Sequence, residues 1–159
     1  MWQIRDQRVI FLRIGILCMI ACIWACKKVP VGDQKIKPPV RSYIVTARID
    51  KKGTNTNSEG TAMLKGRYDE GTKVLSYKLE YRNLIPEEIS LRNGPKGSRG
   101  TLTAIIYKNT GATVPLPLSG TLTLTPLQER NLVKGFWFVS VNTLALSPEI
   151  SGILTLKQN

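Results

Sequence analysis

Apolar and polar residues alternate along most of the chain after Ser42. In SYIVTARID (42–50) one face is wholly apolar from Tyr43 to Ile49, and the other face carries Thr46 and Arg48. A period of two residues with one wet face is typical of antiparallel β-strands. The same pattern predicts further strands at residues 60–68, 72–81, 88–91, 101–108, 120–125, 136–143 and 149–156.

Turn residues separate these segments and one helical pattern interrupts them. Polar turn formers fill 51–60, DEG at 69–71 predicts a hairpin turn, and prolines mark 111–118 as a loop or edge. In TPLQERNLVKG (125–135), a threonine, a proline and a glutamine stand where a capping box requires them. We therefore predict an all-β fold: an antiparallel, Greek-key-like β-sandwich of seven or eight strands with one short helix.

The first 25 residues have a different pattern. Residues 1–13 carry three arginines and one aspartate, and the next twelve, IGILCMIACIWA, are uncharged and apolar. A membrane-spanning helix needs about 20 apolar residues. A basic segment followed by a shorter apolar core is instead the layout of a secretory signal peptide.

The end of the apolar run resembles a bacterial lipobox. IWAC (23–26) has an aliphatic residue, a variable one, a small one and then Cys26, the expected lipidation site; Trp24 is bulkier than usual there. An ordinary signal or an uncleaved anchor is the alternative. The predicted organisation is a signal peptide at 1–25, the lipidated cysteine with a Lys/Pro-rich tether at 26–41, and the sandwich at 42–159. We expect a protein anchored by lipid in the bacterial cell envelope, in contact with the outer membrane on its periplasmic or surface side.

The positions of the cysteines and the net charge limit the kinds of site and the kinds of partner that the chain can have. Cys18 and Cys22 lie in the leader, so after cleavage Cys26 is the sole thiol, which excludes a disulfide, a zinc–thiolate site and a cysteine nucleophile. The net charge is +12, of which +10 remains after residue 25, and the charges are scattered. Such a surface attracts nucleic acid, anionic lipid and acidic polysaccharide alike, but a generally solvated basic surface is the preferred interpretation. Nucleic acid is not an expected partner outside the cytoplasm.

The segment LRNGPKGSRG (91–100) concentrates glycine, proline and basic residues between two predicted strands. A phosphate-binding loop would need G-x-x-x-x-G-K-[ST] leading into a helix, and neither is present. A hairpin connection is the preferred interpretation. The alternative is a contact loop in which Lys96 and Arg99 bind a ligand.

Catalytic side chains are scarce. The chain contains no histidine, so no serine has an imidazole partner. The adjacent acids at 69–70 and 87–88 lie beside turns, where acids are usually solvated. Glu149 is expected to order a turn through backbone hydrogen bonds. Trp137 and Phe138 point to opposite faces of one strand, so one can lie in the core while the other is exposed. An exposed ring would stack on a sugar, which makes Trp137 a candidate ligand contact, but packing under the tether or the short helix is the preferred interpretation.

The order of these features resembles a CHRD domain, the module named after chordin, over most of residues 42–157. The family pattern His-Ile-His-Gly-Pro corresponds to LRNGP (91–95), Tyr-Val-Asn-Val-His-Thr to FVSVNT (138–143), and a closing Pro-Gly-Gly-Glu-Ile-Arg-Gly-like strand to SPEISGIL (147–154). The residues shared with the family pattern are Gly94, Pro95, Val139, Val141, Thr143, Glu149, Ile150 and Gly152.

The departures from the family pattern matter as much. Leu91, Asn93 and Asn142 stand where the family has histidines. Leucine neither ligates a metal nor titrates, and a neutral amide is a poor ligand for transition metals. We therefore expect neither a metal site nor a cofactor.

These observations predict a non-catalytic envelope lipoprotein whose CHRD-like domain binds a ligand or supports structure. Its partners would be the membrane, through the lipid anchor, and a protein or acidic glycan ligand. Two alternatives stay open: an enzyme acting on an envelope substrate, and an adhesin-like binder of acidic polysaccharide.

Overall fold

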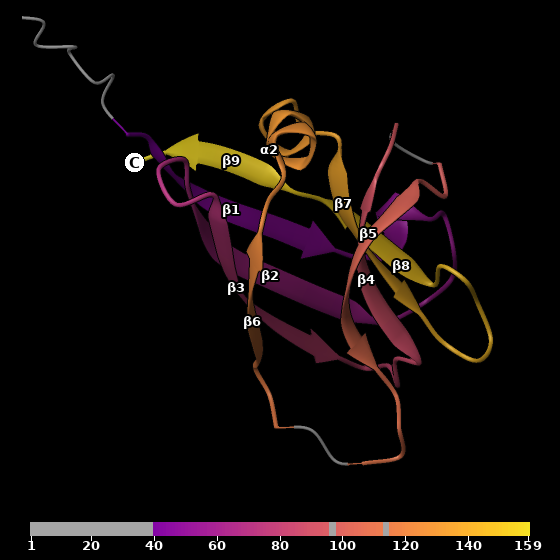
Figure 1. Cartoon of the computed structure of the whole chain (residues 1–159). Helices are drawn as coiled ribbons and strands as arrows, with labels where there is room; N and C mark the ends of the chain where they lie inside the picture. The colour runs from indigo at the N-terminus through magenta and orange to yellow at the C-terminus, as the bar shows by residue number, and fades with distance from the viewer. Residues whose placement is uncertain (1–39, 96–97, 113–114) are drawn as a thin grey trace, which may run out of the picture. The chain divides into compact units, whose positions relative to one another are not determined.

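A computed structural model describes residues 40–159, apart from 96–97 and 113–114. They form two antiparallel sheets, with strand orders β6-β3-β2-β1-β9 and β5-β4-β7-β8 (Figure 1). The larger sheet consists of β1 (Ser42–Ile49), β2 (Thr61–Asp69), β3 (Val74–Arg82), β6 (Leu118–Thr123) and β9 (Thr155–Gln158). The smaller sheet consists of β4 (Glu88–Asn93), β5 (Thr101–Lys108), β7 (Trp137–Asn142) and β8 (Ile150–Ile153).

The alternation seen in the sequence builds the core between the sheets. Val45, Leu64 and Leu79 face inward from the larger sheet, and Ile89 and Val141 from the smaller one, all with no exposed surface. They belong to a single apolar cluster that draws on both sheets. The predicted all-β sandwich is confirmed.

One predicted strand is wrong in extent. The segment 149–156 is two strands, since β8 pairs with β7 in the smaller sheet and β9 pairs with β1 in the larger. Leu154, between them, is 1% exposed, and its N–H donates to the carbonyl of Trp137 at 2.9 Å. The inward alternation continues through this crossing, so periodicity alone does not reveal the change of sheet.

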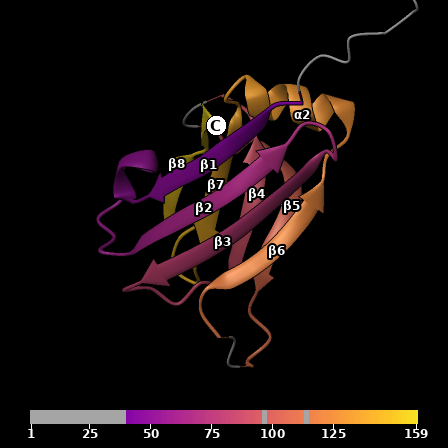
Figure 2. The same ribbon diagram turned by 90° about the vertical axis from the view of Figure 1, so that its left-hand side faces the viewer.

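The short helix α2 (Pro126–Val133) forms as its sequence predicts, at one end of the two sheets (Figure 2). The hydroxyl of Thr125 accepts from the Gln128 N–H, and the Gln128 side chain accepts from the Thr125 N–H at 2.9 Å. This capping box satisfies backbone donors that the first turn leaves unpaired. Leu132 anchors the helix in the core, where it is fully buried.

Connections also follow the sequence, with small shifts. The 69–71 turn joins β2 to β3, and the Asp69 carboxylate accepts from the Thr72 N–H at 2.8 Å. The polar loop 51–60 begins with a 3-10 turn, η1 (Lys51–Gly53). Strand β6 begins at Leu118, two residues before the predicted start, because this side chain is buried in the core.

Candidate functional site

The face of the smaller sheet that points away from the core carries an unusual polar feature. Ile89 and Leu91 face the core, so the alternating position Ser90 faces outward, directly opposite Ser140 of β7. Both serines are nevertheless buried, and they are the two buried polar residues in the part of the chain that the structure describes. Neighbouring groups on the outer face therefore shield both hydroxyls from solvent.

The first cover is the connection between β4 and β5, the stretch predicted as a hairpin. The strands pair from Asn93 opposite Thr101, which confirms the hairpin. The Arg92 Nε–H donates to the carbonyl of Arg99 at 2.9 Å and draws the connection back over its own strand. Gly100 has a positive φ of 58°, and a Cβ there would lie 2.7 Å from the Phe138 ring. Only glycine allows this close approach.

On the opposite side of this outer face from the β4–β5 connection lie η1 and strand β8. Asp50 and Ser151 form an isolated antiparallel bridge between the end of β1 and β8. The Asp50 carboxylate accepts from the Lys52 N–H at 2.9 Å and from Arg48 Nε at 3.1 Å. Gly152 lies so close to β1 that an added Cβ would meet the Arg48 carbonyl. This close approach explains why residue 152 is a glycine.

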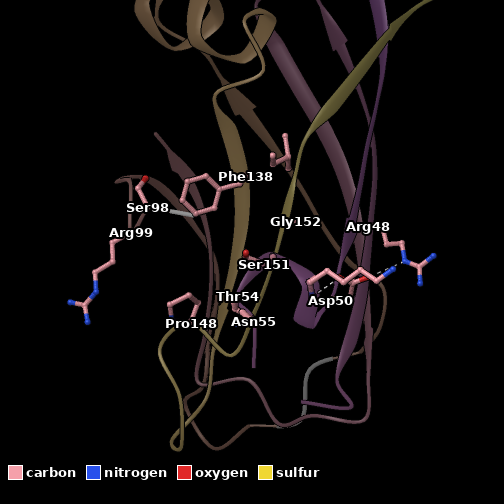
Figure 3. A pocket seen from close by; sticks show the side chains of 13 residues that line it. Arg48, Asp50, Thr54, Asn55, Ser98, Arg99, Phe138, Pro148, Ser151 and Gly152 are labelled. Carbon is pink, nitrogen blue, oxygen red and sulfur yellow. Dashed lines mark hydrogen bonds and ion pairs between the residues drawn. The ribbon is translucent and has the colours of Figure 1, made fainter. Parts of the chain in front are cut away.

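A groove runs between these two sides, over β7 and β8 (Figure 3). Its main part has a volume of about 760 Å³, and a smaller cleft of about 90 Å³ continues it toward Asn142. The two parts share Ser98, Arg99, Phe138 and Pro148. We call them together the outer-face groove. The charged residues that line it are Arg48, Asp50, Lys52, Arg92 and Arg99.

The outer-face groove is strongly cationic. Four of its five charged residues are basic, and the one acid, Asp50, is already engaged by Arg48. Within the described residues, no carboxylate lies within ion-pair distance of Lys52, Arg92 or Arg99. Figure 3 shows Arg99 and Arg48 on opposite sides of Phe138, with both side chains extending away from it. Basic residues therefore lie at both ends of the groove, and Ser140, Asn142 and Ser151 are among the polar residues that line it.

The positions aligned with the family histidines do not converge. Leu91 has no exposed surface and packs in the core. Asn93 pairs with Trp137 at one end of the β4–β7 ladder, whereas Asn142 pairs with Glu88 at the other end. Of the three positions, Asn142 alone lines the outer-face groove. Nothing in this arrangement gathers them into a shared site.

The other predicted contact residues have mixed outcomes. Trp137 as a ligand contact is wrong: the residue has no exposed surface and packs among core side chains, in line with the preferred expectation that the ring is packed. Arg99 is exposed and lines the outer-face groove. Lys96 lies outside the described residues. The N–H of Gly94 donates to the carbonyl of Phe136 at 2.9 Å, and the carbonyl of Pro95 accepts from Ser98, so both residues shape the hairpin connection.

Glu149 fastens loops together. Its carboxylate accepts from the hydroxyls of Ser58 and Thr143, and its carbonyl accepts from Thr54 and Thr56, both at 2.7 Å. The predicted role in ordering a turn thus uses side-chain hydroxyls of two loops, whereas the sequence suggested backbone donors. These contacts occupy both carboxylate oxygens.

The adjacent acid pairs also have structural partners. Hydrogen bonds from the Thr72 N–H and hydroxyl hold the pKa of Asp69 below its usual value, while Glu70 accepts from the Tyr43 hydroxyl at 3.0 Å. Glu87 accepts from the Asn109 side chain at 2.9 Å. Among the described residues, no group of three or more His, Cys, Asp or Glu side chains could hold a metal ion.

The sequence reasoning missed Arg92 and Ser140. One signal was available: EISL and FVSV each place a serine among apolar residues, an unusual composition for a buried strand. The fact that these serines face each other depends on the pairing register, which no local pattern states.

The fold and site together define an antiparallel two-sheet β-sandwich with a cationic groove on the outer face of its smaller sheet. Comparison with family models, with curated proteins and with solved structures finds no match for the chain. In residues 40–159, as far as the structure describes them, no helix has the length and apolar character to cross a membrane.

Proposed function

We propose that this chain is a cell-envelope lipoprotein, anchored through a lipid on Cys26, whose CHRD-like sandwich is a non-catalytic binding module. The observation that carries the proposal is the order of segments: a basic stretch, a twelve-residue apolar run, the IWAC motif and a Lys/Pro-rich segment. The first strand of the sandwich begins at Ser42, soon after that segment.

The character of the outer-face groove supports a binding role. It presents guanidinium, hydroxyl and amide groups but no imidazole or thiol, since the chain has no histidine and its three cysteines precede Lys27. A serine without a base partner is a weak nucleophile at neutral pH. Recognition of a polar, negatively charged ligand therefore suits these groups better than acid–base chemistry does.

Metabolic labelling with an alkyne analogue of palmitate tests the anchor. In a bacterial host, the wild-type chain is expected to be labelled and to sediment with membranes. The Cys26→Ser chain should be unlabelled and should appear in the soluble fraction with the circular dichroism of a folded β-protein.

The leader supplies a matched control, because Cys22→Ser removes a thiol only four residues away. This variant should keep both the label and the membrane association. Labelling that survives Cys26→Ser, or is lost with Cys22→Ser, would show that Cys26 is not the lipidation site.

A further inference from the structure

We propose that the outer-face groove binds an acidic polysaccharide, with Arg92 and Arg99 holding a carboxylate or sulfate group of the sugar chain. This inference rests on the proposed function in that a protein anchored outside the cytoplasm meets such polymers. The residues that carry it are separate from the anchor, so each can be tested without the other.

The first step concerns the anion. Arg92 is half-buried, and its Nε–H is fixed on the carbonyl of Arg99. No hydrogen bond within the described residues uses its terminal nitrogens. A guanidinium held by one donor keeps a fork of N–H groups that matches a carboxylate or sulfate. Fixing the side chain in advance also lowers the entropy that binding would cost.

The second step concerns the sugar hydroxyls. The Ser140 hydroxyl donates to the Asn142 side-chain oxygen at 3.2 Å, so the amide nitrogen of Asn142 is available as a donor. The hydroxyl of Ser90, opposite Ser140, is fully buried and does not line the groove, so it contributes nothing to ligand binding. The free amide donor of Asn142 beside the Arg92 guanidinium suits a ligand that carries both hydroxyl and charged groups.

The third step separates a polymer from a small anion. Basic residues line both ends of the groove: Arg92 and Arg99 at the hairpin, and Lys52 of η1 with Arg48 at the other end. The Arg48 side chain is 77% exposed and is paired with Asp50, so Lys52 is the basic residue at that end without an ion pair among the described residues. Figure 3 shows the two ends on opposite sides of Phe138. Asp50 offsets part of the charge at the η1 end. A single anion would engage one end, whereas a chain with repeated charges engages both.

The fourth step favours a glycan over nucleic acid. Proteins that bind single strands stack bases on exposed aromatic rings. Phe138, the aromatic residue that lines both parts of the groove, is only 7% exposed and packs beside Gly100. The groove therefore lacks a stacking platform for bases, while its hydroxyl and guanidinium groups remain suited to charged sugars.

The test measures binding of the purified full-length protein in detergent to alginate and to heparin by titration calorimetry. The double variant Arg92→Gln/Arg99→Gln is expected to bind at least about tenfold more weakly. Arg99→Gln alone should weaken binding by about threefold or more. This single variant matters because the Arg99 side chain makes no hydrogen bond within the described residues, so its loss leaves the hairpin intact.

Arg67→Gln/Arg82→Gln provides the matched control. It removes the same two charges from exposed positions of β2 and β3 in the larger sheet. Its binding should change by less than about threefold. Equal losses in both double variants would show that overall charge, rather than the groove, is responsible, and would overturn the proposal.

Further probes separate the ligand classes. Neutral dextran should not bind. Binding to single-stranded DNA, or to phosphatidylglycerol vesicles, that depends on Arg92 and Arg99 while alginate and heparin do not bind would also overturn the proposal. Failure of palmitate labelling at Cys26 with glycan binding intact would refute the anchor alone, so the two proposals fail in distinguishable ways.

Discussion

At the scale of single residues, Glu149 shows how a half-buried carboxylate can hold two loops together. Its two oxygens and its carbonyl accept from four hydroxyls on the 51–60 loop and at Thr143. Removing the carboxylate leaves the hydroxyls of Ser58 and Thr143 without this acceptor, while the carbonyl keeps its two partners; losing two partly buried hydrogen bonds costs more than one surface hydrogen bond is worth. The residue thus connects segments that lie more than 90 positions apart in the sequence.

We predict that Glu149→Ala lowers the free energy of unfolding by about 1–3 kcal/mol. Urea denaturation followed by circular dichroism measures this loss. Glu59→Ala is the control, because Glu59 pairs with Lys51 through a side chain that is 83% exposed. Such surface pairs contribute little, so no measurable change is expected. Equal stability of the two variants would contradict the role assigned to Glu149.

Individual residues also show which features of the structure local sequence patterns predict and which they do not. The apolar faces of β1 and β2, the capping box at Thr125 and the hairpin after Asn93 all follow from local patterns. The cover over Ser90 and the separation of Asn93 from Asn142 do not. Both depend on which strands pair and in what register, and this information is distributed over the whole chain.

At the scale of elements, the hairpin connection after β4 is shaped by one glycine. Gly100 and Gly111 both have positive φ, at 58° and 79°. A Cβ on Gly100 would collide with the Phe138 ring, whereas one on Gly111 would meet nothing within 4 Å. Substitutions at these two glycines therefore separate the cost of backbone strain, present at both, from the cost of a steric clash with Phe138, present only at Gly100.

We predict that Gly111→Ala costs about 1–2 kcal/mol of stability, because only the left-handed backbone is penalised. Gly100→Ala should cost about 1–3 kcal/mol more, since the ring must also move. Chemical denaturation of the two variants measures the difference. Matching values would mean that the connection does not pack on Phe138.

Helix α2 is fastened to the β2–β3 hairpin by a charged contact. Lys73 Nζ lies 2.7 Å from a Glu129 carboxylate oxygen. The hydrogen bond from Lys73 is the main reason that the pKa of Glu129 falls below its usual value. Burial, together with the nearby Glu129 charge, raises the pKa of the Tyr68 hydroxyl well above its ordinary value. Tyr68 therefore stays neutral beside the ion pair.

The lowered pKa of Glu129 gives stability a defined pH dependence. A carboxylate whose pKa is lower in the folded state contributes stability above its unfolded pKa, and this contribution is lost as the pH falls through the folded pKa. Because Lys73 is 43% exposed, we expect a contribution of about 1 kcal/mol or less.

Glu129→Gln should remove that contribution. Unfolding free energies of the wild type and the variant should differ at about pH 6, and the difference should shrink as the pH falls below the ordinary titration range of glutamate. Urea titrations across this range measure the difference. A gap that stays constant with pH would show that the loss is steric rather than electrostatic.

At the scale of the whole molecule, the two sheets share one core. Side chains from both sheets and Leu132 of α2 form a single buried cluster. Strands β8 and β9 follow one another directly yet belong to different sheets, so the chain joins the layers at Leu154. Neither sheet retains a buried face without the other, which favours one cooperative transition.

We predict that residues 40–159, produced alone, fold and unfold in a single two-state transition. Trp2 and Trp24 are absent from this fragment, so its tryptophan fluorescence comes only from Trp137, which is fully buried in the smaller sheet. Far-UV circular dichroism reports on the strands of both sheets. Coincident urea curves from the two probes are expected, because loss of either sheet exposes the common core. Fluorescence that changes before or after the circular dichroism signal would instead show that the sheets unfold separately.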